Sequence, residues 1–136
     1  MIKLAVAGVA GRMGRIILQL AVQDKSFRIA GGIEQRGHAA LGSDVGTLIG
    51  AGLWGVTVQQ DAESVLRKAD VLIDFSHFSA LPGNLDACVK TKTGLVVGTT
   101  GLSDPLLKKI ALASKKIPVV QSPNMSVGVN LLLKLA

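Results

Sequence analysis

The chain has 136 residues, the size of one domain, and no run of about eighteen apolar residues that could cross a membrane, so a single soluble domain is expected. Its net charge is +6, from 15 Lys and Arg residues against 9 Asp and Glu residues, and the basic residues are spread along the chain. Aromatic residues make up only 3%, and both features favour an anionic small molecule over nucleic acid as binding partner. One cysteine, Cys88, excludes an internal disulfide, and two distant histidines, His38 and His77, give no metal-ligand spacing.

The N-terminal run MIKLAVAGVAG reaches its glycines after a short apolar stretch, and no small-residue cleavage site follows it. Because this run does not form a signal peptide, a cytoplasmic protein is expected. Short runs rich in Val and Ile then alternate with segments of helical period, the pattern of a parallel sheet covered by helices on both faces. The expected strands are 2–7, 27–33, 56–58, 71–75, 95–97 and 119–121.

Four helices are expected between these strands. The first spans 12–22, the second follows Asp61 as a candidate N-cap, and the third begins near Ser79. The fourth begins at Ser103 or Asp104. The apolar stripe of the first helix is expected to consist of Ile16, Ile17, Leu20 and Ala21. That of the fourth is expected to consist of Leu106, Leu107, Ile110 and Ala113.

Two segments depart from the alternation. Residues 35–55 hold six glycines without a period and are expected to form a long loop over the surface, in which Trp54 fixes the loop rather than serves a site. Residues 126–136, SVGVNLLLKLA, are expected to begin a helix, and no glycine, proline or polar cap ends it. The expected organisation is a dinucleotide-binding domain over 1–125, followed by the start of a helix that leads into a further, C-terminal domain.

Three glycines at a spacing of three, Gly8, Gly11 and Gly14, lead from the end of the first strand into the first turn of the first helix. Such a turn is typical of dinucleotide-binding domains, because the free amides and the positive end of the helix face the pyrophosphate. Gly8 permits the tight turn, Gly11 lets a phosphate approach the backbone, and Gly14 lets the helix pack closely on the strand. Arg12 adds a positive charge. The triplet alone is also compatible with a turn that binds nothing.

An acidic residue at the end of the second strand supports the interpretation as a cofactor site. Glu34 lies twenty residues after Gly14, directly behind the apolar strand FRIAGGI, where a carboxylate accepts hydrogen bonds from the adenosine ribose. A carboxylate there repels the 2′-phosphate of NADPH, but Arg36 stands two residues away and can offset the repulsion. NADH and NADPH therefore both remain open.

Two later strands end at the same edge of the predicted sheet, where ligands bind in open α/β folds. The segment VVGTTGLSD, residues 96–104, places two hydroxyls after a strand and suits a nicotinamide ribose or amide. The segment VVQSPNMSVGVN, residues 119–130, places an asparagine amide after another strand. Each segment alone is equally compatible with an ordinary β-to-α loop.

The motifs VAGVAGRMGR, GTTG and SPNMSVGVN, in this order and at this spacing, resemble the N-terminal cofactor domain of the 4-hydroxy-tetrahydrodipicolinate reductase family of lysine and diaminopimelate biosynthesis. The resemblance spans the whole chain. It implies an α/β fold with a Rossmann-like, doubly wound parallel sheet that stops before the substrate-binding and oligomerisation domain. It also implies that the intact enzyme transfers hydride from NADH or NADPH to a cyclic C=N-containing dicarboxylate and forms a homotetramer, with no nucleic acid or membrane partner.

The resemblance further implies which residues bind the cofactor. Those expected around the pyrophosphate are Gly8, Val9, Ala10, Gly11, Arg12 and Met13. Glu34 is expected at the adenosine ribose, and Gln35 stands where the family often has an arginine for the 2′-phosphate, so that Arg36 is the substitute nearest in sequence. Those expected on the nicotinamide side are Gly98, Thr99, Thr100, Ser122, Pro123, Asn124 and Met125.

No catalytic residue is expected in this chain, because the family's substrate-binding and proton-donating residues lie beyond the position of Ala136. The chain alone is therefore expected to be inactive.

Asp74, in DFSHFSA, is interpreted as a cap of its own turn and Cys88 as a core residue. His38 and His77 are interpreted as loop histidines without a chemical role. The alternatives are the cofactor domain of another Rossmann oxidoreductase and a dinucleotide-binding module without catalysis.

Overall fold

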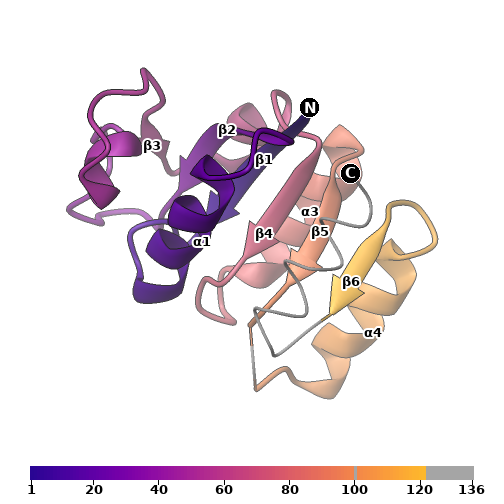
Figure 1. Cartoon of the computed structure of the whole chain (residues 1–136). Helices are drawn as coiled ribbons and strands as arrows, with labels where there is room; N and C mark the ends of the chain where they lie inside the picture. Colours follow the sequence, from indigo (N-terminus) through magenta and orange to yellow (C-terminus); the bar gives the residue numbers. More distant parts are fainter. Residues whose placement is uncertain (100, 122–136) are drawn as a thin grey trace.

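The computed structural model describes residues 1–99 and 101–121 (Figure 1). Its strands are β1 (Ile2–Ala7), β2 (Phe27–Ile33), β3 (Val58–Gln59), β4 (Val71–Asp74), β5 (Gly94–Val97) and β6 (Val119–Gln121). Its helices are α1 (Arg12–Val22), α2 (Ala62–Leu66), α3 (Leu81–Thr91) and α4 (Asp104–Ala113), with a 3₁₀ turn η1 (Gly46–Ile49). The strands pair in parallel in the order β3-β2-β1-β4-β5-β6, which confirms the doubly wound sheet.

Each face of the sheet has its own core, because successive side chains of a strand point to opposite sides. Helices α2, α3 and α4 cover one face and α1 covers the other, and Figure 1 shows α1 in front of the sheet with α3 and α4 behind it. The strand residues of the first core include Ala5, Ala7, Leu72, Leu95 and Val97. Those of the second include Leu4, Val6, Ile29, Ile73 and Val96.

Capping side chains fix the starts of two helices where the sequence predicts them. Asp61 is the N-cap of α2, and its carboxylate accepts from the Ser64 amide at 3.5 Å and from the Ser64 hydroxyl at 2.7 Å. Ser103 is the N-cap of α4 and accepts from the Leu106 amide at 3.4 Å. Helix α1 has the predicted bounds, and α3 begins at Leu81, slightly later than expected.

The predicted apolar stripe of α1 is confirmed for Ile17 and Ala21 and wrong for Leu20, while Ile16 is half-buried. The buried residues are Gly14, Ile17, Leu18 and Ala21, whereas Leu20 is 43% exposed. The helix touches the backbone of the β1–α1 turn at Gly14, so the residues three, four and seven positions further on face the core. In α4 the prediction holds for Leu106, Ile110 and Ala113, but Leu107 is 39% exposed.

The segment 35–55 is a folded loop, built around one carboxylate. Asp44 accepts from the backbone amides of Gly46, Trp54, Gly55 and Val56 at 2.8, 2.9, 2.7 and 3.1 Å. The Trp54 bond, followed by the other three, holds the pKa of Asp44 below its usual value. The Trp54 side chain packs against Gly46 and against the core beneath α1, so Trp54 fixes the loop as predicted.

Part of this loop belongs to the core, contrary to the expectation of a surface excursion. Val45 is fully buried among the residues beneath α1, and its amide donates to the Val56 carbonyl oxygen at 2.7 Å. Thr57 forms an antiparallel bridge with Asp44. Residues 56–57 therefore pair with the loop, and β3 is confined to Val58–Gln59, later than the predicted 56–58.

Candidate functional site

A pocket of about 290 Å³ lies at the edge of the sheet where the parallel strands end. It is enclosed by the turn from β1 to α1, the end of β2 and the loop from β4 to α3. Its described lining includes Gly8, Gly11, Glu34, His38, Ser76 and His77.

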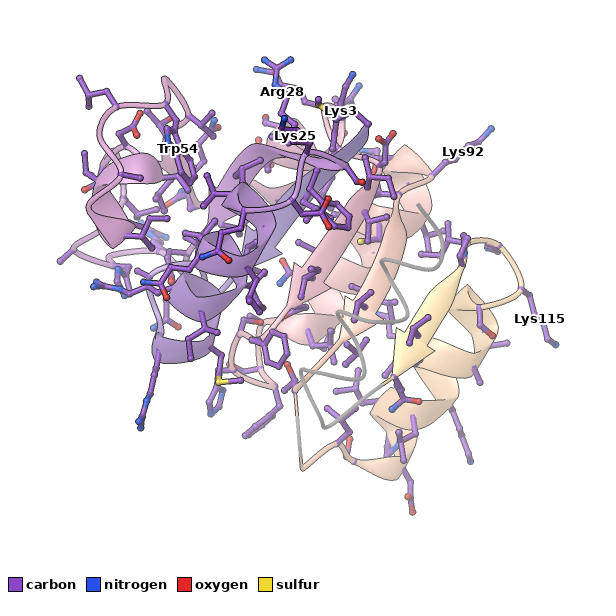
Figure 2. The ribbon with its side chains drawn as sticks, in the orientation of Figure 1. Lys3, Lys25, Arg28, Trp54, Lys92 and Lys115 are labelled. Carbon is purple, nitrogen blue, oxygen red and sulfur yellow. The ribbon has the colours of Figure 1, made fainter. Side chains whose placement is uncertain are left out.

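A larger hollow of about 340 Å³ lies at the opposite, amino edge and is lined by Lys3, Arg28 and Lys68 among others. Figure 2 shows Lys3 and Arg28 grouped there with Lys25. None of the predicted cofactor residues that the structure describes lines this hollow. The glycine turn therefore assigns the candidate site to the carboxyl-edge pocket.

Gly8 in the turn and Gly14 in the first part of α1 both stand where a side chain has no room. Gly8 has φ +72°, and a Cβ on it would lie 3.0 Å from both the Phe75 carbonyl oxygen and the Ser76 amide nitrogen. Gly14 rests on the backbone of Gly8 and Val9, and a Cβ there would lie 2.7 Å from the Val9 carbonyl oxygen. The tight turn at Gly8 is thereby confirmed, and the close packing predicted for Gly14 is made with the turn after β1 rather than with the strand itself.

Gly11 has a different environment. It is the N-cap of α1, and it has no side chain that could occupy the free amides of the first helical turn. Its own amide donates to the Gly8 carbonyl oxygen at 3.0 Å. Among the described atoms within 4 Å, a Cβ at Gly11 would meet that carbonyl oxygen alone, at 3.2 Å. The fold thus accepts a small side chain here after a minor shift, while the pocket that Gly11 lines loses space.

The other predicted residues of the turn differ in what they can offer a ligand. Arg12 is exposed and Met13 is half-buried. Val9 is fully buried, and its side chain packs over Gly32, so only its backbone can contribute. Arg15 was missed by the sequence analysis: its Nε donates to the Ala10 carbonyl oxygen at 3.0 Å and braces the turn. The sequence signal that could have found Arg15 is its place as the second arginine of the motif GRMGR.

The structure brings Glu34 directly to this turn. Its Oε2 accepts from the Ala10 amide at 2.8 Å, and its side chain is only 9% exposed. The Glu34 amide donates to the Gln59 carbonyl oxygen at 3.0 Å, which holds the residue between β2 and the neighbouring β3. One carboxylate oxygen thus braces the turn, and Oε1 remains available on the pocket side.

His38 also reaches the pocket, which the sequence analysis did not foresee. Its Nε2 lies 4.0 Å from Glu34 Oε1, and its Nδ1 accepts from the Ala40 amide at 3.0 Å. No periodic pattern in the sequence predicts this position of His38, because the residue belongs to an irregular loop that returns toward the end of β2. Arg36, the predicted partner of a 2′-phosphate, is exposed and is not among the described lining residues.

The end of β4 carries a buried acid with a structural role. Asp74 is 0% exposed; its Oδ1 accepts from the Ser76 amide at 2.8 Å and also from the Ser76 hydroxyl, and its Oδ2 accepts from Asn84 Nδ2 at 3.0 Å. These bonds confirm that Asp74 caps its turn. His77 is exposed on the same loop and lines the pocket, with its Nδ1 2.9 Å from the Ser79 hydroxyl.

The residues predicted on the nicotinamide side are described only in part. Gly98 is buried against the Phe75 ring, which occupies the space that a Cβ would need. The Thr99 hydroxyl donates to the Ser76 carbonyl oxygen at 3.0 Å. These contacts place the end of β5 against the β4–α3 loop, and neither residue belongs to the described lining of the pocket. The remaining predicted residues lie outside the described part of the chain: Thr100, Ser122, Pro123, Asn124 and Met125.

Cys88 is not a candidate nucleophile. Burial, with a smaller contribution from the charge of Asp74, raises the pKa of its thiol to about 12, so the thiolate is scarce at neutral pH. Within residues 1–99 and 101–121, no His, Cys, Asp and Glu side chains gather in a group of three or more suited to a metal ion. Nor does any helix of that part have the length and apolar character to span a membrane.

Comparisons with known proteins point to one family of reductases. The sequence model of the family described as dihydrodipicolinate reductase, N-terminus, matches residues 2–125. Over 135 residues, the chain is 44% identical to a 4-hydroxy-tetrahydrodipicolinate reductase of Magnetococcus marinus and 42% identical to one of Thiobacillus denitrificans. Each alignment covers 99% of this chain and 50% of the relative, so the chain spans about half the length of the curated relatives it matches.

A solved structure shares the fold. Dipicolinate-bound dihydrodipicolinate reductase from Paenisporosarcina sp. TG-14 superposes with a TM-score of 0.75 at 22% identity, and the match covers 99% of this chain and 52% of that chain. A parallel sheet in this strand order, with a glycine-rich turn into α1, is the Rossmann arrangement that binds nicotinamide dinucleotides. From the match over residues 2–125, the chain belongs to the dihydrodipicolinate reductase family, in which it corresponds to the N-terminal, dinucleotide-binding domain.

Proposed function

We propose that this chain binds NADH or NADPH in the carboxyl-edge pocket, as the cofactor domain of a reductase. The observation that carries the proposal is the bond of 2.8 Å between Glu34 Oε2 and the Ala10 amide. It holds a carboxylate suited to ribose hydroxyls against a turn suited to a pyrophosphate, beside a helix start that lacks a side-chain cap. These residues fit a dinucleotide, with its ribose and its phosphates recognised by adjacent groups.

Each part of the site has a proposed task. The turn from Gly8 to Met13 binds the pyrophosphate through backbone amides, aided by the positive end of α1 and the exposed Arg12. Glu34 orients the adenosine ribose. Gly98 and Thr99 are proposed to border the nicotinamide together with residues outside the described part: Thr100, Ser122, Pro123, Asn124 and Met125.

For the whole enzyme we infer reduction of a cyclic C=N-containing dicarboxylate, the substrate class that the relatives' names indicate. A bound nicotinamide supplies the hydride, and this domain supplies binding and orientation. A net charge of +6 favours the approach of a dianion. We place the groups that bind the substrate and donate its proton outside the cofactor domain 1–125, in the half of the relatives' length that this chain does not match.

Calorimetric titration of this chain with NADH and NADPH tests the proposal. Gly11→Val should nearly abolish binding, because the side chain enters the space of the phosphate. Glu34→Ala should weaken binding about ten-fold, the effect of hydrogen bonds to a charged group. Gly83→Ala is the matched control, since nothing described lies within 4 Å of a Cβ there. Equal affinities of wild type and Gly11→Val would refute the site.

A further inference from the structure

A histidine stands beside the carboxylate proposed to bind the ribose. His38 Nε2 lies 4.0 Å from Glu34 Oε1, and both residues line the carboxyl-edge pocket. We propose that His38 is a binding residue for the 2′-hydroxyl of the adenosine ribose and that, with Glu34, it selects NADH over NADPH. This inference rests on the proposed cofactor site and adds a residue and a preference to it.

The hydrogen bonds of His38 determine what its ring can offer. Nδ1 accepts from the Ala40 amide at 3.0 Å, so in the neutral imidazole the proton is on Nε2. The backbone around the ring is also held: the His38 amide donates to the Gln35 carbonyl oxygen at 3.1 Å, and the Leu41 amide donates to the His38 carbonyl oxygen at 3.2 Å. His38 therefore presents a fixed N–H donor on the side of Glu34.

The two facing groups are complementary to a hydroxyl. Glu34 Oε1 accepts and His38 Nε2 donates, and their separation of 4.0 Å is too long for a direct bond. One oxygen atom can bridge them from beside the line that joins the two atoms, at roughly 2.7 Å from the carboxylate and roughly 2.9 Å from the imidazole, which are ordinary hydrogen-bond lengths. A hydroxyl satisfies both partners, because it donates one hydrogen bond and accepts another.

A 2′-phosphate cannot satisfy the same pair. Its oxygens are ionised at neutral pH, so they bring no proton to Glu34, and their charge repels a carboxylate that is only 9% exposed. The cation expected to offset this repulsion, Arg36, is exposed and outside the described lining of the pocket. The lining residue at the family's arginine position is Gln35, which is uncharged. The site therefore favours the free hydroxyl of NADH.

Titration of this chain with NADH, NADPH and 2′-deoxyadenosine NADH tests the assignment. NADH should bind at least ten-fold more tightly than NADPH. His38→Leu should weaken NADH binding about five-fold, as expected for one hydrogen bond, and leave the affinity for the 2′-deoxy analogue within two-fold. His38→Gln, which keeps an N–H donor, should recover part of the loss. Arg36→Leu, on the same loop, should change none of the three affinities.

The outcomes separate this inference from the proposed function. If His38→Leu weakens NADH and its 2′-deoxy analogue equally, the residue has only a structural role and the assignment is refuted. Equal or tighter binding of NADPH refutes the preference. If wild type binds none of the three dinucleotides, the proposed cofactor site itself fails. An unchanged unfolding midpoint of His38→Leu shows that the loop remains folded, so that the affinities report on the ligand contact.

Discussion

Glu34 is prepared for a ligand before one arrives. Its Oε2 is already bound to the Ala10 amide, and its carboxylate is largely withdrawn from water. Ligand binding at the proposed site therefore would not have to immobilise this side chain, which lowers the entropic cost of the proposed ribose contact. Because the same carboxylate touches the glycine turn, a change at Glu34 affects both the ribose and the pyrophosphate parts of the proposed site.

Cys88 offers a test of burial at a single residue. It is 0% exposed, and burial raises the pKa of its thiol to about 12. We expect an aromatic disulfide reagent to leave the folded chain unlabelled at about pH 8 and to label one thiol per chain after unfolding, since the thiolate is the reactive form. Absorbance of the released thiol measures the reaction. Rapid labelling of the folded chain would show that the face of α3 that carries Cys88 is not held against the core.

The loop 35–55 depends on Asp44, whose carboxylate accepts four backbone amides. Asp44→Asn replaces an anionic acceptor by an amide with one acceptor oxygen, so we expect the thermal midpoint to fall by several degrees and thermolysin to cleave this loop first. Circular dichroism and mass spectrometry report these changes. Asp86→Asn is the control, because it removes an exposed pair with Lys109 and should leave the midpoint nearly unchanged.

Local signals predict the elements of this chain well, and tertiary contacts explain the errors. The starts of α2 and α4 follow from Asp61 and Ser103, which act on their own first turns. The phase of α1 instead depends on Gly14, whose contact with the β1–α1 turn rotates Leu18 inward and Leu20 outward. Because both residues are leucines, their hydrophobicity cannot predict which of them is buried. Only the position of the sheet relative to the helix decides it.

At the scale of the whole molecule, the parallel sheet makes the site partly predictable. Strands that run in one direction end at one edge, so Glu34 could be assigned to the glycine turn from chain order alone. His38 could not, because its position depends on the path of an irregular loop that Asp44 organises from further along the chain. The role of Arg15 could not be predicted for a related reason, because its hydrogen bond to the Ala10 carbonyl oxygen depends on the shape of the turn.

Stability of the whole domain should depend on pH in a direction set by its carboxylates. Hydrogen bonds from the Trp54 backbone, the Ser64 hydroxyl and the Arg67 side chain lower the pKa of Asp44, Asp61 and Glu63 respectively. A lowered pKa in the folded state adds stability that is fully present above the ordinary value and is lost as the pH falls through the folded-state value.

The ordinary values are 3.8 for the two aspartates and 4.5 for Glu63, so the thermal midpoint should be level from about pH 7 to about pH 5 and should fall progressively below 4.5. Calorimetric scans across this range measure it. The combined variant Asp44→Asn, Asp61→Asn, Glu63→Gln should start from a lower midpoint and lose less on acidification, because its side chains at these positions no longer titrate. A wild-type midpoint that holds at pH 3 would contradict the assignment of these three carboxylates as stabilising acceptors.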